Sequence, residues 1–531
     1  MSDPEADRRE LLARYLTDPD GDVFALVGLP EVVKGAVFAR YSRSASGVKD
    51  LLAEEFAGDL GGGGAERASA LYEKVFGDYG DDSVAQLGGA HVALENVSNV
   101  VTKRIEWGRL AAYLEQSTRY VAYDRPVAGR WRYHREADVM ASRHAARYEE
   151  VLDHLFATYA AALPVMREHV RARWPLTAGT SESAWRAATR AKALDLLRGL
   201  LPAATEANVG MFASGQSYEL LLLRLAADPL PEARALGAAL LTQLRAVIPS
   251  FVSRVDRPDR GHVWRDHLAR TRTDTRALAA RHVVADPAPV APVELVDWWP
   301  RDPVDAEVAV VVGALLPHTT VGERQLEAQV RTWPAEQRAE VLRAYVGERV
   351  NRRHRPGRAL ERVTYRFDVL SDYGGFRDLQ RHRMCTIEWQ DLTVAHGYDT
   401  PPEVEEAGLG PVWHDAMARA ADLFHALRTE LPDAAQYVVP FASRVRWTIQ
   451  INARAAMQML ELRSQPQGHP QYRRVVQDMH RAIRDVAGHV AVADAMVHVD
   501  HGVGDLERLA SEEALEARRA ARRPGPEGSG E

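Results

Sequence analysis

The second half of the chain carries two patterns that predict regular secondary structure. Residues 364–369 alternate apolar with polar side chains, which is typical of a half-buried strand. Ser371 and Asp372 follow as N-cap residues for a helix that runs towards Arg383. A longer segment repeats apolar residues at steps of three and four, which predicts an amphipathic helix. Its apolar positions are Trp413, Met417, Ala420, Phe424 and Leu427.

The first half shows the same order of elements. An apolar run at His91–Leu94 predicts a strand, and Ser98 follows it as a helix cap. A long amphipathic helix comes later, with apolar residues at Tyr148, Leu152, Leu155 and Tyr159. Because a strand, a helix and a later helix recur in both halves, the pattern indicates an internal duplication.

Proline and glycine mark the boundaries. The segment DPAPVAPVE, residues 286–294, alternates proline with small residues and predicts an extended linker. It separates a first domain, residues 1–285, from a second domain, residues 295–515. The end of the chain, residues 516–531, finishes in Pro, Gly and Ser and is expected to be a disordered tail. The GGGG at 61–64 is interpreted as a flexible loop, because it matches no phosphate-binding fingerprint.

Composition narrows the functional classes. The chain has 531 residues and a net charge of −7, so nothing global favours nucleic acid as a partner. It has no apolar run of about 18 residues, so no membrane span is expected. The charged N-terminus does not resemble a signal peptide, and the single cysteine, Cys385, fits a reducing cytoplasm. His498, Asp500 and His501 are interpreted as a helix end, so no metal site is expected.

The tripeptide Arg-His-Arg occurs twice, at residues 353–355 and at residues 381–383. It is a weak motif here, because only five of the 67 basic residues are lysine and arginine is common. The first copy precedes Pro356 and is interpreted as an exposed turn. The second copy follows the predicted strand and helix. It is followed by INARAAMQMLELR, residues 451–463, whose amide and guanidinium groups suit an anionic planar ligand.

These segments resemble the signature of the flavin-dependent thymidylate synthases. That signature is Arg-His-Arg, seven residues, then Ser-x-Arg-Tyr, with a later Asn-Ala-Arg helix. The second half keeps the first and last parts but has Asp391 where the family has serine. In the first half, 107–109 (WGR) align with Arg-His-Arg, and 117–120 (STRY) are intact seven residues later. Its later helix, FASGQSYELLLLR at 212–224, has lost the Asn and Arg but keeps a final arginine.

The resemblance implies an α/β fold made of two tandem copies of the family's twisted, mainly antiparallel sheet flanked by helices. It also implies conversion of dUMP to dTMP with methylenetetrahydrofolate and NADPH, through FAD. The halves carry complementary partial motifs, so composite sites are expected, and a homodimer of this chain would imitate the family's tetramer. The chain would act in the cytoplasm on small molecules, without membrane or nucleic acid.

Site residues are carried over from the family motifs. Ser117, Arg119 and His382 would be catalytic. The substrate-binding residues would be Glu115, Gln116, Arg224 and Arg463, with Arg463 matching the position of Arg224. The cofactor-binding residues would be Arg381, His382, Arg383, Asn452, Arg454 and Gln458. Asp378 stands where the family has glutamine, and an acid there requires a partner, for which Arg377 is the candidate.

Two other functions stay open. The chain could be a paralogue that modifies another pyrimidine nucleotide, with a reshaped pocket. It could also be a non-catalytic nucleotide-binding homologue, and the basic run Arg349–Arg362 could then contact nucleic acid.

Overall fold

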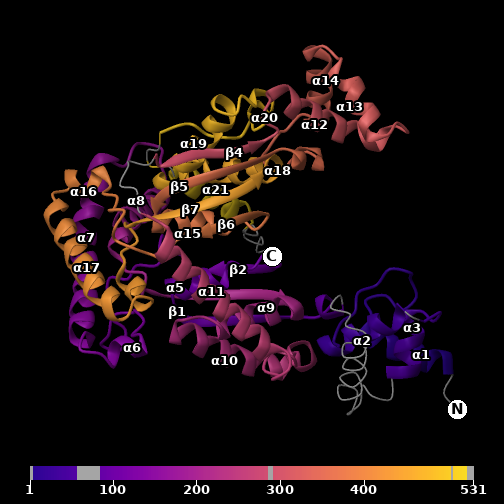
Figure 1. Cartoon of the computed structure of the whole chain (residues 1–531), viewed down its shortest axis with the longest axis horizontal. Coiled ribbons are helices and arrows are strands. Elements are labelled where there is room, and N and C mark those ends of the chain that lie inside the picture. Colours follow the sequence, from indigo (N-terminus) through magenta and orange to yellow (C-terminus); the bar gives the residue numbers. More distant parts are fainter. Residues whose placement is uncertain are drawn as a thin grey trace, which may run out of the picture.

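A computed structural model describes residues 4–42, 44–56, 84–284, 291–503, 506 and 508–522. Two small antiparallel sheets lie one above the other in Figure 1, with helices around them. The first sheet has the order β1-β3-β2, and the second has the order β4-β5-β7-β6. The strands are β1 (Gly89–Ser98), β2 (Ala111–Glu115), β3 (Glu206–Ser214), β4 (Val293–Trp299), β5 (Thr364–Asp372), β6 (Cys385–Trp389) and β7 (Arg444–Asn452). The α/β class with antiparallel sheets is therefore confirmed.

Helices make up most of the remaining described chain. Those of the first half are α1 (Pro4–Tyr15), α2 (Glu31–Tyr41), α3 (Val48–Leu51), α5 (Asn99–Ile105), α6 (Ala137–Met140), α7 (Ala145–Arg173), α8 (Glu182–Leu197), α9 (Gly215–Ala226), α10 (Pro231–Val247) and α11 (Gly261–His282). Those of the second half are α12 (Pro303–Leu315), α13 (Glu323–Arg331), α14 (Ala335–Val346), α15 (Tyr373–Leu379), α16 (Pro402–Glu406), α17 (Gly410–Glu430), α18 (Ala453–Arg463), α19 (Pro470–Asp485), α20 (Val490–Asp494) and α21 (Leu509–Arg522). No helix among the described residues is long and apolar enough to cross a bilayer.

Equivalent elements follow one another in the two halves. The series β1, α5, β2, α7, β3 and α9 corresponds to β5, α15, β6, α17, β7 and α18, and the strands take the same spatial order. The predicted cap at Ser98 is confirmed, because its Oγ accepts a hydrogen bond from the Val101 N–H at 3.1 Å. Ser214 and Asn452 cap α9 and α18 in the same way. The long helices predicted from apolar spacing are α7 and α17, and those apolar positions are buried.

The two halves meet along a seam with approximate two-fold symmetry. Its centre is the pair Pro202 and Pro440, which face each other in an isolated antiparallel bridge. On either side the halves exchange matching backbone hydrogen bonds. The Ala203 N–H donates to the Val439 carbonyl at 2.8 Å, and the Phe441 N–H donates to the Leu201 carbonyl at 2.9 Å. One hydrophobic core runs through both halves, so the halves pack against each other and are not separate domains.

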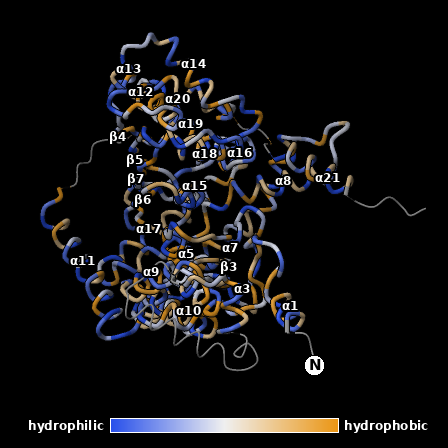
Figure 2. The backbone as a smooth tube through the Cα atoms, turned by 90° about the vertical axis from the view of Figure 1, so that its right-hand side faces the viewer, coloured by the Kyte–Doolittle hydropathy of each residue, from blue (hydrophilic) through white to orange (hydrophobic). Residues whose placement is uncertain are grey.

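Two expectations about boundaries change, and a third concerns residues that the structure does not describe. The predicted linker, 286–294, overlaps β4, because Val293 and Glu294 pair with β5, while 285–290 fall outside the described residues. Residues 516–522 of the predicted disordered tail continue α21, which packs on α8 (Figure 2). Alanine and arginine, which favour a helix, dominate residues 516–522, and Glu516 accepts a hydrogen bond from the Ser183 hydroxyl of α8. The GGGG at 61–64 and residues 523–531 lie outside the described residues.

Candidate functional site

A pocket of about 220 Å³ opens at the seam, where corresponding turns of the two halves meet. One turn, 107–109, follows α5, and the other, 381–383, follows α15. The helix predicted to run towards Arg383 ends at Leu379, so the second tripeptide lies in the connection to β6. The lining residues are Glu106, Trp107, Arg109, Arg224, Gln380, His382, Arg383, Cys385, Thr386, Ile387 and Glu388.

Residues of the first turn are held by the second half. The Trp107 indole N–H donates to the Ile387 carbonyl at 3.1 Å. The Arg109 guanidinium donates to the Thr386 hydroxyl at 2.9 Å. Both acceptors belong to β6, an edge strand of the second sheet. The wall of the pocket therefore forms only when the two halves are docked.

Three arginines give the pocket an excess of positive charge. Arg109, Arg224 and Arg383 form no ion pair within the part of the chain that the structure describes. The Arg224 guanidinium lies 5.3 Å from the centre of the Trp107 ring, and its buried Nε has no hydrogen-bond partner there. Burial lowers the pKa of Arg224 below its usual value. Unpaired guanidiniums with free donors are suited to binding a carboxylate or a phosphate.

His382 adds a neutral polar group. Its Nε2 accepts a hydrogen bond from the Nε of Arg463 at 2.9 Å. Burial, together with the positive charges of Arg463 and Arg381, holds the pKa of the His382 imidazole well below its usual range. With Nε2 acting as acceptor, the ring proton is on Nδ1, so that nitrogen is a donor.

The acid at position 378 is paired, although with other residues than the sequence indicated. Asp378 accepts a hydrogen bond from Arg381 at 2.6 Å, and Arg198 and Arg463 lie 3.6 and 3.8 Å from its carboxylate. Burial opposes its ionisation, but these arginines hold the pKa of Asp378 well below its usual range. Arg377, the expected partner, binds Glu115 instead. Asp378 therefore largely neutralises the positive charge of Arg381 and Arg463.

Glu115 lies in a buried ionic cluster behind the pocket. Lys103 donates to its carboxylate at 3.0 Å, and Arg377 donates to its other oxygen. Burial alone would raise the pKa of Glu115, but Arg377 and Lys103 hold it down at about 2. The side chain is thus a fixed carboxylate whose oxygens are occupied, and it is not among the lining residues.

The segment expected to bind the nucleotide, 116–119, also makes contacts within the protein. Arg119 makes two hydrogen bonds of 2.6 Å with Asp195 of α8, and it contacts the Tyr472 hydroxyl at 3.4 Å. The Ser117 hydroxyl accepts a hydrogen bond from the backbone N–H of Arg119 at 3.3 Å. The Gln116 side-chain oxygen is buried and has no hydrogen-bond partner among the residues that the structure describes. These residues lie at the seam but do not line the pocket.

Arg119 and His382 nevertheless belong to one continuous network. Arg119 contacts Tyr472, the Arg463 guanidinium lies 5.6 Å from the centre of the Tyr472 ring, and Arg463 binds His382. Asp378 lies among the same arginines. The structure therefore links Arg119 of the first half with His382 of the second half through side-chain contacts across the seam.

The residues expected from the later helix of the second half lie elsewhere. Asn452 caps α18, and Arg454 donates to the Pro356 carbonyl at 3.0 Å and to Glu361 at 3.2 Å. Neither of them, nor Gln458, lines the pocket. Because Asn452 and Ser214 both act as N-caps, the two later helices align one residue away from the predicted register. Arg463 consequently corresponds to Leu225, and its match with Arg224 was wrong.

Sequence reasoning missed two buried partners, Asp195 and Arg198. Both belong to the apolar stretch AKALDLLRGLL, residues 191–201, which has no counterpart in the family motifs. A charged residue between apolar neighbours indicates a buried ion pair, so the position of Asp195 and Arg198 among leucines could have predicted their role. The Cys385 thiol donates to the His382 carbonyl at 2.7 Å, and burial raises its pKa to about 12, so it is not a nucleophile.

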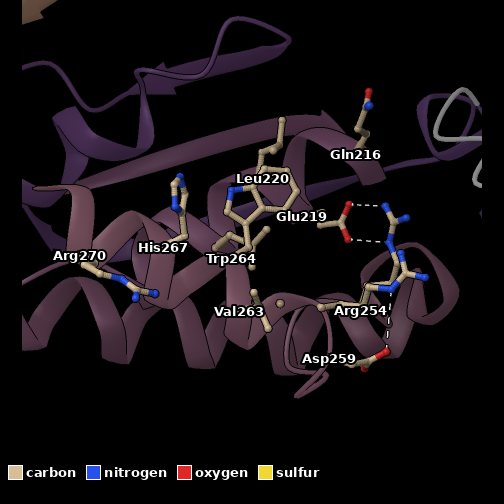
Figure 3. A pocket seen from close by; sticks show the side chains of 12 residues that line it. Gln216, Glu219, Leu220, Arg254, Asp259, Val263, Trp264, His267 and Arg270 are labelled. Carbon is tan, nitrogen blue, oxygen red and sulfur yellow. Dashed lines mark hydrogen bonds and ion pairs between the residues drawn. The ribbon is translucent and has the colours of Figure 1, made fainter.

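A larger pocket of about 700 Å³ lies between α9 and α11, away from the predicted residues (Figure 3). In this pocket Glu219 is paired with Arg254 (Figure 3). The Arg254 guanidinium donates hydrogen bonds of 2.9 and 2.8 Å to the two carboxylate oxygens. The other polar residues on its wall include Asp259, His267 and Arg270. The residues that line this pocket all belong to the first half, whereas the seam pocket is lined by both halves, so the seam pocket is the stronger candidate.

Comparisons with known proteins identify the family of the chain. The family model described as "Thymidylate synthase complementing protein" matches two segments, residues 32–250 and 295–488. A UPF0159 protein of Chlamydia muridarum is 37% identical over 525 residues, which cover 96% of this chain and 98% of the relative. One from Chlamydia pneumoniae is 38% identical over 490 residues, with 90% and 92% covered. One from Thermoplasma acidophilum is 30% identical over 508 residues, with 90% and 97% covered.

The two matched segments contain both turns of the seam pocket and the two sheets, apart from the first two residues of β4. The chain therefore belongs to the thymidylate synthase complementing protein family, the family of the flavin-dependent thymidylate synthases.

Proposed function

We propose that the chain is a flavin-dependent methyltransferase of thymidylate synthase type, with a composite site at the seam. It would convert dUMP to dTMP with methylenetetrahydrofolate and NADPH, in the cytoplasm, and its halves would be two copies of one fold. The observation that carries this proposal is the seam pocket. There, Arg109 and Arg224 of the first half converge with Arg383 of the second half, without ion pairs in the described chain and beside a neutral His382.

The residues present fit part of a flavin nucleotide. A pyrophosphate needs forked cationic donors, and Arg109, Arg224 and Arg383 supply them. The pocket volume of about 220 Å³ is below the roughly 300–1,000 Å³ of typical ligand sites. A single chain would therefore hold only part of FAD or of the nucleotide. A second copy of the chain would complete the site, which supports a homodimer.

FAD, once bound and reduced by NADPH, supplies the electron pair for the transfer of the one-carbon unit. The chain's own residues provide binding and electrostatics. Arg463 fixes the His382 ring, so that its Nδ1–H is held in one direction as a hydrogen-bond donor.

The proposal is tested by flavin binding and by turnover. Purified chain is incubated with FAD and desalted, and its absorbance is recorded between about 350 and 500 nm. We expect retained flavin in the wild type and at least tenfold weaker binding in Arg383→Gln, because a charged hydrogen bond contributes about 1.5–3 kcal/mol. The matched control is Arg419→Gln, whose arginine is exposed and paired with Asp415 at 2.7 Å. Absence of flavin from the wild type after reconstitution would overturn the proposal.

A second candidate function rests on Arg119. In the structure its guanidinium is already bound by Asp195, so the segment 117–120 does not offer a free cation to a nucleotide phosphate. This observation favours a reshaped pocket, as in a paralogue acting on another pyrimidine nucleotide or a non-catalytic homologue. Release of tritium from C5 of labelled dUMP or dCMP separates these functions. Release from dUMP supports thymidylate synthesis, and release from dCMP alone supports the paralogue. Salt-sensitive binding of RNA or DNA, with neither flavin binding nor release, supports the non-catalytic homologue.

A further inference from the structure

A second polar cluster lies at the seam, apart from the candidate site. It contains His134, which follows the bridge at Tyr133, Glu136 just before α6, and Glu232 in the first turn of α10. None of these residues lines the seam pocket. Tyr437 of the second half closes the cluster, with its ring centre 5.2 Å from that of His134. The cluster therefore joins three segments of the first half to one of the second half.

The three side chains present their ligand atoms to one another. The Nε2 of His134 lies 3.1 Å from Glu136 Oε2 and 3.8 Å from Glu232 Oε2, and all three atoms lie within 4.8 Å of one another. Two ligands that each bind an ion at about 2.0–2.2 Å are themselves about 3–4 Å apart. The observed separations thus admit an ion between the three atoms without movement of the backbone.

Burial and charge give an independent reason to expect a cation. Glu136 is fully buried, and its second oxygen, Oε1, has no hydrogen-bond partner in the described chain. Glu206 adds a third carboxylate that interacts electrostatically with both His134 and Glu232. Arg132 and Arg135 are the other positive charges that act on Glu206. Burying an ionised carboxylate with one oxygen unpartnered is unfavourable, so a cation bound beside Glu136 would stabilise it.

The neighbouring hydroxyls orient the acids. Ser98 donates to Glu232 through its N–H at 2.8 Å and its hydroxyl at 2.6 Å, and the Tyr437 hydroxyl donates to Glu232 at 2.6 Å. Tyr437 also interacts with Glu136, so its hydroxyl can turn to that carboxylate when an ion binds Glu232. His134 is partly exposed, which leaves a path for the ion and a position for water. Ligands fixed by such outer hydrogen bonds are typical of metal sites in proteins.

We propose that His134, Glu136 and Glu232 form a binding site for one divalent transition-metal ion. One imidazole and two carboxylates suit zinc or manganese, and zinc binds more tightly in the usual order of affinities. The ion has a structural role, because it ties the first turn of α10 and the segment before α6 together beside Tyr437. This site was not expected from the sequence, since its three residues are far apart along the chain and match no spaced motif.

The experiment uses the full chain without an affinity tag. After treatment with a chelator and desalting, the protein is titrated separately with ZnCl₂, MnCl₂ and MgCl₂, and bound metal is measured by calorimetry and elemental analysis. We expect one zinc per chain and a higher Tm on binding. Glu136→Gln keeps the shape of the side chain and removes the charge, and we expect it to lose at least tenfold in zinc affinity. His134→Ala is expected to lose the site.

His414→Ala is the matched control, because His414 also pairs with a glutamate, Glu405, at 2.9 Å but belongs to no such trio in the described chain. This variant should bind zinc as the wild type does. If the His134 variant does not fold, two other measurements test the metal site. One is cobalt binding by the wild type, followed through its visible absorption, and the other is the zinc affinity of the Glu136→Gln variant. Absence of zinc and cobalt binding by the wild type, or unchanged zinc affinity in Glu136→Gln, would show that protonated His134 alone balances the acids.

Discussion

The turns after α5 and α15 occupy equivalent places in the two halves, yet their surroundings differ in kind. Around the second turn, Arg381 lies 3.8 Å from Glu115, within a buried group of ions. Around the first turn, the corresponding residues are Trp107 and Trp389, whose ring centres are 5.9 Å apart in an edge-to-face arrangement. One side of the seam is therefore ionic, and the related side is aromatic.

This difference separates stability from function. A buried ion pair gives little net stability, and apolar replacements of similar volume are often neutral or stabilising. The aromatic side demonstrates that the fold accepts such a replacement at this position. We infer that the ionic side persists because charge is useful there, next to the pocket that carries Arg383 and His382. Four changes test how far the two sides differ.

Removal of the shared carboxylate should have the largest effect. Glu115→Ala leaves the buried cations Lys103 and Arg377 without their common partner. We expect a loss of about 3–5 kcal/mol in the free energy of unfolding, measured by urea denaturation. The control is Glu327→Ala, which breaks an exposed pair with Arg331 at 2.8 Å and should cost less than about 1 kcal/mol. Equal losses in the two variants would mean that the ionic side is not a buried cluster.

The pH dependence of stability follows from the same carboxylate. Its pKa in the folded protein is about 2, because the charges of Arg377 and Lys103 outweigh the effect of burial. In the unfolded chain a glutamate titrates near roughly 4.3. The stabilisation is thus present above the unfolded pKa and is lost as pH falls through that value towards 2. Between pH 5 and 2 the wild type should lose more stability than Glu115→Gln, and parallel curves would contradict the assignment.

The aromatic side should respond more weakly. Trp107→Ala removes the hydrogen bond to the Ile387 carbonyl and the contact with Trp389. We expect a loss of about 1–2 kcal/mol in the free energy of unfolding. Trp264 has nearly the same exposed fraction, 45% against 46% for Trp107, but lies on α11. The Trp264→Ala variant should lose less, and a similar loss would show that the aromatic side contributes nothing specific to the seam.

The smallest effect is expected at the first Arg-His-Arg copy. Residues 353–355 are exposed and lie in a turn, as the sequence predicted, where the Arg353 N–H binds the Asn351 side chain at 2.9 Å. Arg353→Gln should change the free energy of unfolding by less than about 0.5 kcal/mol. It should also leave flavin retention unchanged, in contrast to Arg383→Gln. Loss of flavin in the Arg353 variant would contradict the proposal, because it would show that the cofactor binds at 353–355 and not at 381–383.

Local patterns in the sequence were enough for the elements that frame the site. The alternation at 364–369 became β5, the cap at Ser98 began α5, and the apolar spacing around Tyr148 marked α7. Each of these depends on neighbours within a few residues, so spacing alone carries the information. The resemblance added the two motif segments and their complementary losses, and both segments do lie at the seam.

Only the tertiary structure decided which charges are free. Arg119 and Arg383 are both motif arginines, yet the first is bound by Asp195 and the second forms no ion pair in the described chain. Asp195 lies in a segment that no motif covers, and His134 meets Glu232 from almost a hundred residues away. The sequence by itself determined the elements with a strong local pattern, among them β5, α7 and α17, and the number of arginines. Their pairing was decided by the docking of the two halves, because electrostatic interactions depend on distances in space that residue spacing does not encode.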